Sequence, residues 1–137
     1  MKKKILVVAV LAIFSAVLMP LCVSGQNSVP TVDGGAGPCS VEFTATDSNG
    51  AVVSNAQIIV HVEYGFLGAH KLDLQVATDS HGKARFIGLP EKTDNGLFFE
   101  AFKGNLKGVA TVDPNSECEA HHGIYMTSRK FAENPEQ

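Results

Sequence analysis

Tryptophan is absent from the 137 residues, and the chain has only two tyrosines, Tyr64 and Tyr125. Sugar-binding sites generally stack a pyranose ring on an exposed Trp or Tyr side chain, so this composition favours a protein partner over a carbohydrate. Basic residues are also scattered after residue 25, and no run of them is longer than the pair Arg129-Lys130. Without a basic patch, nucleic acid is not an expected partner.

The motifs of common catalytic and cofactor sites are absent as well. The sequence has no Gly-x-Ser-x-Gly, no His-Glu-x-x-His and no Gly-rich phosphate loop. We therefore expect no cofactor and a chain that is not an enzyme.

The N-terminus has the pattern of a secretory signal peptide. Lys2 to Lys4 precede an apolar run from Ile5 to Met19, which is shorter than the roughly 20 residues of a membrane-spanning helix. We predict cleavage after Gly25 and a secreted or periplasmic protein without stable membrane insertion. The alternative is a lipoprotein anchored at Cys22, but Leu21 stands where a lipoprotein signal usually has Gly, Ala or Ser.

Removal of the leader makes the chain more acidic and leaves an even number of cysteines. Eight basic and fourteen acidic residues remain, so the formal charge changes from −3 to −6. Cys39 and Cys118 remain, without the Cys-x-x-Cys spacing of redox or zinc-binding pairs. In a small exported domain such a pair predicts one disulfide, worth about 4 kcal/mol in the chain-entropy model.

Most of the remaining sequence alternates between apolar and polar residues, which is typical of half-buried strands. We interpret residues 26–38 as a flexible linker, 39–128 as the domain and 129–137 as a polar tail. The expected strands cover about 41–46, 57–64, 71–76, 83–87, 96–103, 106–112 and 119–127. The prediction is an all-β fold, a seven-stranded antiparallel Greek-key β-sandwich of the Ig-like or prealbumin-like type.

Two segments carry a pattern of turn and core residues. They read Asp47-x-x-Gly50-x-Val52-Val53-x-x-Ala56-x-Ile58-x-Val60 and Thr78-Asp79-x-x-Gly82-Lys83-Ala84-x-Phe86-x-Gly88-Leu89-Pro90. The pattern resembles the carboxypeptidase regulatory-like domain, a relative of the B-type repeats of collagen-binding adhesins. The resemblance implies hairpin turns at each Asp-x-x-Gly, a small Ala56 where the chain crosses the core, and a strand ending at Leu89-Pro90. It also implies a non-catalytic binding or structural module.

Two enzyme families use prealbumin-like sandwiches, and neither sequence pattern is present. Hydroxyisourate hydrolases end in Tyr-Arg-Gly-Ser, whereas this chain has Tyr125-Met126-Thr127-Ser128. Intradiol dioxygenases bind iron through two Tyr and two His, but Tyr64 and Tyr125 lack the neighbouring sequence of that family. A small enzyme of this fold remains an alternative to a binding module.

Three histidines are weak candidates for a metal site. His121 and His122 are adjacent, so a regular strand points them to opposite faces, and they cannot bind one ion together. His61 could meet one of them across strands and form a surface site of the zinc or copper type. We favour the simpler interpretation that they are exposed polar positions.

The expected contact surface is the break in alternation between residues 65 and 70. It contains Phe66, Leu67 and His70, and a loop offers the two apolar side chains little to pack against. The alternative is that Phe66 and Leu67 turn into the core. A second candidate surface is the face carrying Phe98 and Phe102, although we expect these phenylalanines to fill the core.

Overall fold

The structure is a computed structural model and describes residues 28–128. The predicted signal peptide (1–25), its cleavage point, the alternative lipid site Cys22 and the polar tail (129–137) lie outside the described residues.

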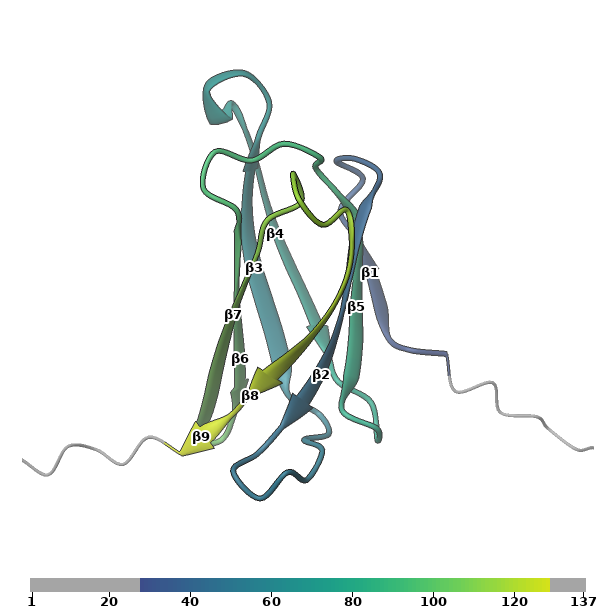
Figure 1. Ribbon diagram of the computed structural model, residues 1–137, viewed down its shortest axis with the longest axis vertical. Helices are drawn as coiled ribbons and strands as arrows, with labels where there is room; N and C mark the ends of the chain where they lie inside the picture. The colour runs from purple at the N-terminus through teal and green to yellow at the C-terminus, as the bar shows by residue number, and fades with distance from the viewer. Residues whose placement is uncertain (1–27, 129–137) are drawn as a thin grey trace, which may run out of the picture.

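Two sheets face each other and form a β-sandwich (Figure 1). One has four strands in the order β1-β5-β2-β8, and the other has five in the order β4-β3-β6-β7-β9. Within residues 28–128 the strands are β1 (Thr31–Asp33), β2 (Cys39–Thr46), β3 (Gln57–Tyr64), β4 (His70–Ala77), β5 (Lys83–Leu89), β6 (Leu97–Lys103), β7 (Leu106–Val112), β8 (Glu119–Tyr125) and β9 (Thr127–Ser128), with a short 3₁₀ turn η1 (Phe66–Gly68).

The core lies between the sheets because each long strand buries alternate residues. In β2 the residues Cys39, Val41, Phe43 and Ala45 are buried, while those between them are only half-buried. Rings from three strands meet at the centre: Phe43 lies 4.6 Å from Phe99 and 6.1 Å from Phe86, between ring centroids. The all-β sandwich expected from the alternation is confirmed.

The strand number and pairing differ from the seven-stranded antiparallel expectation. β2 pairs with β8 in parallel, from Ser40 opposite Glu119 to Thr46 opposite Tyr125. Alternation specifies which residues share a face but not the direction of the neighbouring strand, so the sequence held no signal for this pairing.

The segment interpreted as a flexible linker contains a strand. Thr31–Asp33 forms β1 and pairs in parallel with residues 85–87 of β5. The backbone N–H of Gly34 then donates to the carbonyl oxygen of Ile87 (2.9 Å). Main-chain hydrogen bonds hold these residues, so their Gly-rich, weakly apolar composition was misleading.

Both Asp-x-x-Gly segments form tight turns of the same design. In each, the Gly N–H donates to the Asp carbonyl oxygen at 3.0 Å, and the Asp carboxylate accepts two further backbone N–H groups. The expected hairpin is seen at the first turn, where Thr46 and Val52 form an antiparallel bridge across Asp47–Gly50. The strands that follow each turn nevertheless belong to the opposite sheet. Asp47–Gly50 carries the chain from β2 to β3 and Asp79–Gly82 carries it from β4 to β5, so both connect the two sheets.

Thr78 connects the two crossovers inside the protein. Its buried hydroxyl donates to the carbonyl oxygen of Val53 (2.7 Å) and accepts the N–H of Ala56 (2.9 Å). Ala56 itself has no exposed surface, in agreement with the expectation that a small residue is needed there.

The predicted disulfide between Cys39 and Cys118 is present. It joins the start of β2 to the residue before β8, with the Cα atoms 4.5 Å apart and the two residues 79 positions apart in sequence. Over the described range, no helix is both long and apolar enough to cross a membrane.

Candidate functional site

The predicted contact loop lies at one end of the sandwich, beyond β3 and β4 (Figure 1). We call residues 65–69 the apical loop. Gly65 and Gly68 adopt positive φ angles of 82° and 64°, which glycine does without a side-chain clash. The N–H of Gly68 donates to Gly65 O, and that of Ala69 donates to Phe66 O, both at 3.2 Å. The loop therefore has a defined backbone.

Phe66 and Leu67 form an exposed apolar tip. Their exposed fractions are 86% and 87%, the highest among the large apolar side chains of the described residues. Leu67 also has a φ of 56°, a left-handed conformation that is unusual for a bulky residue. The prediction that this pair is exposed is confirmed, and the alternative that it turns into the core is wrong.

The base of the apical loop is closed by two aromatic rings. His70 is paired with Tyr64 at the end of the β3–β4 ladder. Their rings stack with centroids 5.1 Å apart and planes 26° apart. Gly65 must be glycine here for a second reason, since a Cβ atom would lie 2.8 Å from His70 Cδ2. His70 thus supports the loop from below, while Phe66 and Leu67 project.

A groove of about 320 Å³ runs beside the apical loop. One wall comes from the end of β3 and the loop itself, and the other comes from residues 92–96, which precede β6. Thr93 Oγ1 is buried in this second wall without a hydrogen-bond partner among residues 28–128. The Asn115 side chain donates to Thr93 O (3.2 Å) and so ties the wall to the segment before β8. Glu63, Lys92 and Asp94 make the groove polar and charged, unlike the apolar tip.

The predicted metal-site histidines are not brought together. His61 lies on β3 in the five-stranded sheet, whereas His121 and His122 lie on β8 in the other sheet. His122 Nε2 contacts the Glu117 carboxylate at 2.7 Å. In the part of the chain that the structure describes, no three His, Cys, Asp or Glu side chains are grouped in a way that would hold a metal ion.

His61 instead pairs with Asp73 across the β3–β4 ladder. The hydrogen bond to the Asp73 carboxylate raises the pKa of the His61 imidazole above its ordinary value, and the negative charge of Asp73 adds to this effect. Both side chains are more than three-quarters exposed.

Phe98 and Phe102 lie on the outer face of β6, so the expectation that they fill the core is wrong. The buried residues of this strand are Leu97, Phe99 and Ala101, so positions 98 and 102 point away from the core. Phe98 is 51% exposed, and the ammonium group of Lys107 lies 5.3 Å from the centre of the Phe102 ring. This face is consequently a second exposed surface, interrupted by charge.

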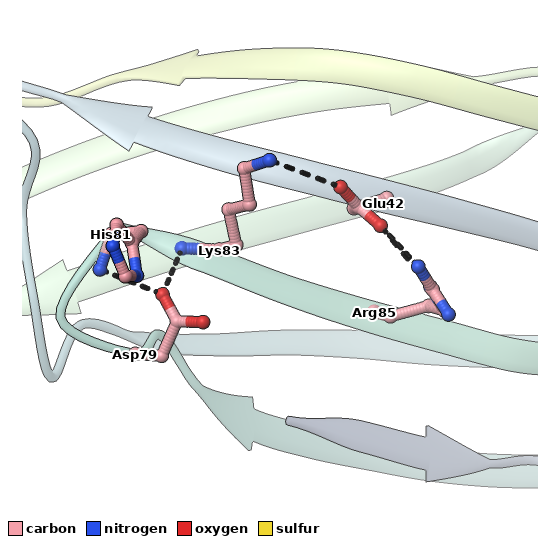
Figure 2. Close-up of polar contacts among 5 residues, drawn as sticks. All are labelled: Glu42, Asp79, His81, Lys83 and Arg85. Carbon is pink, nitrogen blue, oxygen red and sulfur yellow. Dashed lines mark hydrogen bonds and ion pairs between the residues drawn. The ribbon is translucent and has the colours of Figure 1, made fainter. Parts of the chain in front are cut away.

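A charged cluster on the four-stranded sheet was not predicted (Figure 2). Glu42 on β2 accepts hydrogen bonds from Nε (3.2 Å) and Nη2 of Arg85, and Lys83 Nζ lies 3.8 Å away. The Arg85 hydrogen bonds hold the pKa of the Glu42 carboxyl below its usual range, against the opposing effect of desolvation. A shallow hollow of about 210 Å³ beside it includes His121.

Figure 2 also shows how the turn at Asp79 leads into this cluster. The Asp79 carboxylate accepts the backbone N–H groups of Lys83 (2.9 Å) and His81 (2.8 Å), and the bond from Lys83 is the larger cause of its lowered pKa. The charge pairs neutralise one another and connect neighbouring strands. We interpret the cluster as a structural support of the sheet. Its sequence signal was the place of Glu42, Lys83 and Arg85 at alternate, outward positions of the neighbouring strands β2 and β5.

The two tyrosines lie far apart. Tyr64 ends β3, next to the apical loop, whereas Tyr125 ends β8 near the opposite end of the sandwich (Figure 1). The ladder confirms this: Thr127 pairs with Lys107, which lies opposite Phe102, and Phe102 lies opposite Gln57 at the start of β3. The residues present therefore do not fit an iron site made of two Tyr and two His.

No protein-family model matches this sequence, and no curated protein matches it. Solved structures are similar in fold. Hydroxyquinol 1,2-dioxygenase from Pseudomonas putida DLL-E4 has a TM-score of 0.50 and 11% identity, over 74% of this chain and 63% of that chain. Catechol 1,2-dioxygenase from Pseudomonas arvilla C-1 has a TM-score of 0.50 and 11% identity, over 76% and 59%.

The C-terminal domain of shaft pilin spaA from Lactobacillus rhamnosus GG is matched with a TM-score of 0.39 and 13% identity, over 66% of this chain and 97% of that domain. This chain spans less than two thirds of the length of either dioxygenase. At 11% identity, the similarity to the two dioxygenases shows a shared β-sandwich fold alone.

Proposed function

We propose that this chain is a secreted, non-catalytic binding module that docks a protein partner through the apical loop. The observation that carries the proposal is the exposure of Phe66 and Leu67, at 86% and 87%, on the tip of one loop. Contact between apolar side chains and water is unfavourable. The more of such a side chain is exposed, the more favourable is its burial by a partner.

The backbone of the tip supports a role in binding. Leu67 has a φ of 56°, and a bulky residue in this region costs of order 1 kcal/mol or more. Asparagine or glycine would adopt the same angle with less strain. A leucine that is both strained and exposed adds nothing to the stability of the free domain, so its contribution is expected in a complex.

A protein partner fits this site better than a sugar. Tyr64 is the tyrosine nearest the loop, and His70 stacks on one face of its ring. That face is not free to receive a pyranose. An apolar tip beside a groove with charged walls resembles the usual anatomy of a protein interface, with an apolar anchor and a polar rim.

The disulfide supports export. Disulfides form and persist in oxidising compartments, and Cys39 and Cys118 are bonded here. Together with the leader-like N-terminus, this makes the periplasm or the extracellular medium the proposed location. The two Asp-x-x-Gly turns, the buried Ala56 and the end of β5 at Leu89 agree with the proposed relationship to carboxypeptidase regulatory-like domains.

Photo-crosslinking tests the proposed contact directly. A photoreactive phenylalanine analogue replaces Phe66 in one sample and Val52, a half-exposed residue of another loop, in the control. Both proteins are irradiated with a cell-envelope extract of the source organism. We expect a defined protein adduct from position 66, lost when Leu67→Ala is added, and none from position 52. Equal adducts from both positions, or none from position 66, would contradict the proposal.

A further inference from the structure

One long edge of the five-stranded sheet has no hydrogen-bonded neighbour among residues 28–128. β4 forms the end of that sheet and, within the described residues, pairs only with β3. Its eight residues have no other backbone hydrogen bond to the rest of the described chain. An outer strand of this length presents a row of N–H and C=O groups on which another strand can be added.

The outward face of β4 carries charges of alternating sign. Lys71 and Asp73 are both 76% exposed. Each lies opposite a residue of opposite charge character on β3: Lys71 Nζ is 3.4 Å from Glu63, and Asp73 is bonded to His61. Reading outward from β3 to β4, Glu63 is followed by the positive Lys71, and His61 is followed by the negative Asp73.

We infer that β4 is a self-complementary edge, on which β4 of a second copy of this chain pairs antiparallel in a register centred on Leu72. In that register Lys71 of each copy lies opposite Asp73 of the other. The charge rows then run Glu63, Lys71, Asp73 of the second copy, His61 of the second copy. Negative and positive side chains then alternate across the interface, with His61 adding a positive charge when it is protonated. The two five-stranded sheets become one continuous sheet of ten strands.

Neighbouring registers lack this match. A centre at Asp73 places the two Asp73 carboxylates opposite each other, and a centre at Lys71 does the same to the two ammonium groups, which is unfavourable. A centre at Leu74 faces Asp73 with Gln75 and leaves Lys71 opposite Ala77. A register centred between two residues would place the charged outward residues opposite the apolar inward ones, including the buried Leu74.

The occupant is a second copy because the pattern reads the same from both sides. A two-fold interface requires that, where residue i of one copy faces residue j of the other, residue j also faces residue i. With the two-fold axis at Leu72, Lys71 and Asp73 meet this condition. The inference does not depend on the proposed role of Phe66 and Leu67, which lie outside the pairing between residues 70 and 74.

Sedimentation equilibrium over a range of protein concentrations tests this dimer. The wild type is expected to reach twice the monomer mass. Lys71→Glu and Asp73→Lys each turn two attractions into two repulsions, so each variant alone should dimerise about tenfold more weakly or worse. In an equimolar mixture, Glu at 71 of one variant faces Lys at 73 of the other, and the remaining Asp73 faces Lys71. The mixture is expected to recover the dimer.

Glu119→Lys is the matched control for Asp73→Lys, because it makes the same change of charge at an exposed strand position of the other sheet. It should dimerise as the wild type does. All variants are first compared by circular dichroism and thermal unfolding. A wild type that stays monomeric, single variants that still dimerise, or a mixture that stays monomeric would each overturn the inference.

A second measurement needs no variant. Amide hydrogen exchange of residues 70–74 should slow as the wild-type concentration rises, since the outward N–H groups of the edge become hydrogen-bonded. Protection at another edge, or no change with concentration, would also overturn it.

Discussion

Tyr64 and His70 stack on each other at the base of the apical loop, with ring centroids 5.1 Å apart. The pair closes the β3–β4 ladder, and the loop formed by the five residues between them extends from one end of the sandwich (Figure 1). This arrangement separates two roles: the stacked rings hold the loop, and Phe66 and Leu67 are left to make contacts outside the domain.

Replacing Leu67 with asparagine should stabilise the free protein. Asparagine tolerates the left-handed region, so Leu67→Asn removes strain at a φ of 56° and should raise the free energy of unfolding by about 0.5–1 kcal/mol. Urea denaturation measures this change. Phe66→Asn is the control and should show no such gain. A loss of stability in Leu67→Asn would indicate that the leucine packs against the domain.

Thr78 should be intolerant of valine but tolerant of serine. Thr78→Val keeps the shape and removes the hydroxyl, so the N–H of Ala56 and the carbonyl of Val53 lose their partner in a buried place. We expect a loss of about 2 kcal/mol. Thr78→Ser keeps both hydrogen bonds and should cost about 1 kcal/mol for the lost methyl group. Equal losses in the two variants, measured by chemical denaturation, would contradict this role of the hydroxyl.

The two Asp-x-x-Gly turns should respond differently to alanine. Gly50 and Gly82 have φ angles of 77° and 73°, so each Gly→Ala change strains the backbone by about 1–2 kcal/mol. At Gly50 a Cβ atom meets nothing within 4 Å, whereas at Gly82 it would lie 2.8 Å from the carbonyl oxygen of Ala45. Gly82→Ala should therefore lower the melting temperature clearly more than Gly50→Ala. Equal shifts would show that the crossover at Gly82 is not closely packed.

The Glu42 pair should contribute to stability only above acidic pH. Arg85 lowers the pKa of Glu42 below its ordinary value of 4.5, so the folded protein binds this proton less readily than the unfolded chain does. The contribution is fully present above pH 4.5 and is lost as pH falls through the lowered pKa.

Glu42→Gln tests that pH window. It should cost about 1 kcal/mol near neutral pH, a value reduced because Arg85 is partly exposed, and the difference from wild type should shrink on acidification. Denaturation curves at several pH values measure it. A difference that stays constant down to strongly acidic pH would contradict the assignment.

Much of the fold was predictable because alternation identifies strands and faces. β2 illustrates this: Val41, Phe43 and Ala45 alternate with polar residues, and they are buried. The disulfide was predictable from the count of cysteines in an exported domain. The pairing of β2 with β8 was not, since the direction of a neighbouring strand depends on contacts between distant parts of the chain.

The candidate site was predictable only in part. A break in alternation between two glycines placed the exposed tip, and Phe66 and Leu67 were found there. The second wall of the groove, around Thr93, comes from a loop about 25 residues later, which local patterns cannot place. On β6 the expectation that Phe98 and Phe102 are buried was wrong. The charged Glu100 between them indicated that this face of the strand points to solvent.

The double variant Phe66→Ala with Leu67→Ala is the decisive test of the proposed binding role of the apical tip. Both side chains are almost fully exposed, so the free energy of unfolding should change by less than about 0.5 kcal/mol. Affinity for the protein recovered by crosslinking at position 66, measured by calorimetry, should fall about tenfold or more. A large loss of stability, or unchanged affinity with stability intact, would contradict the claim that this tip is the binding surface.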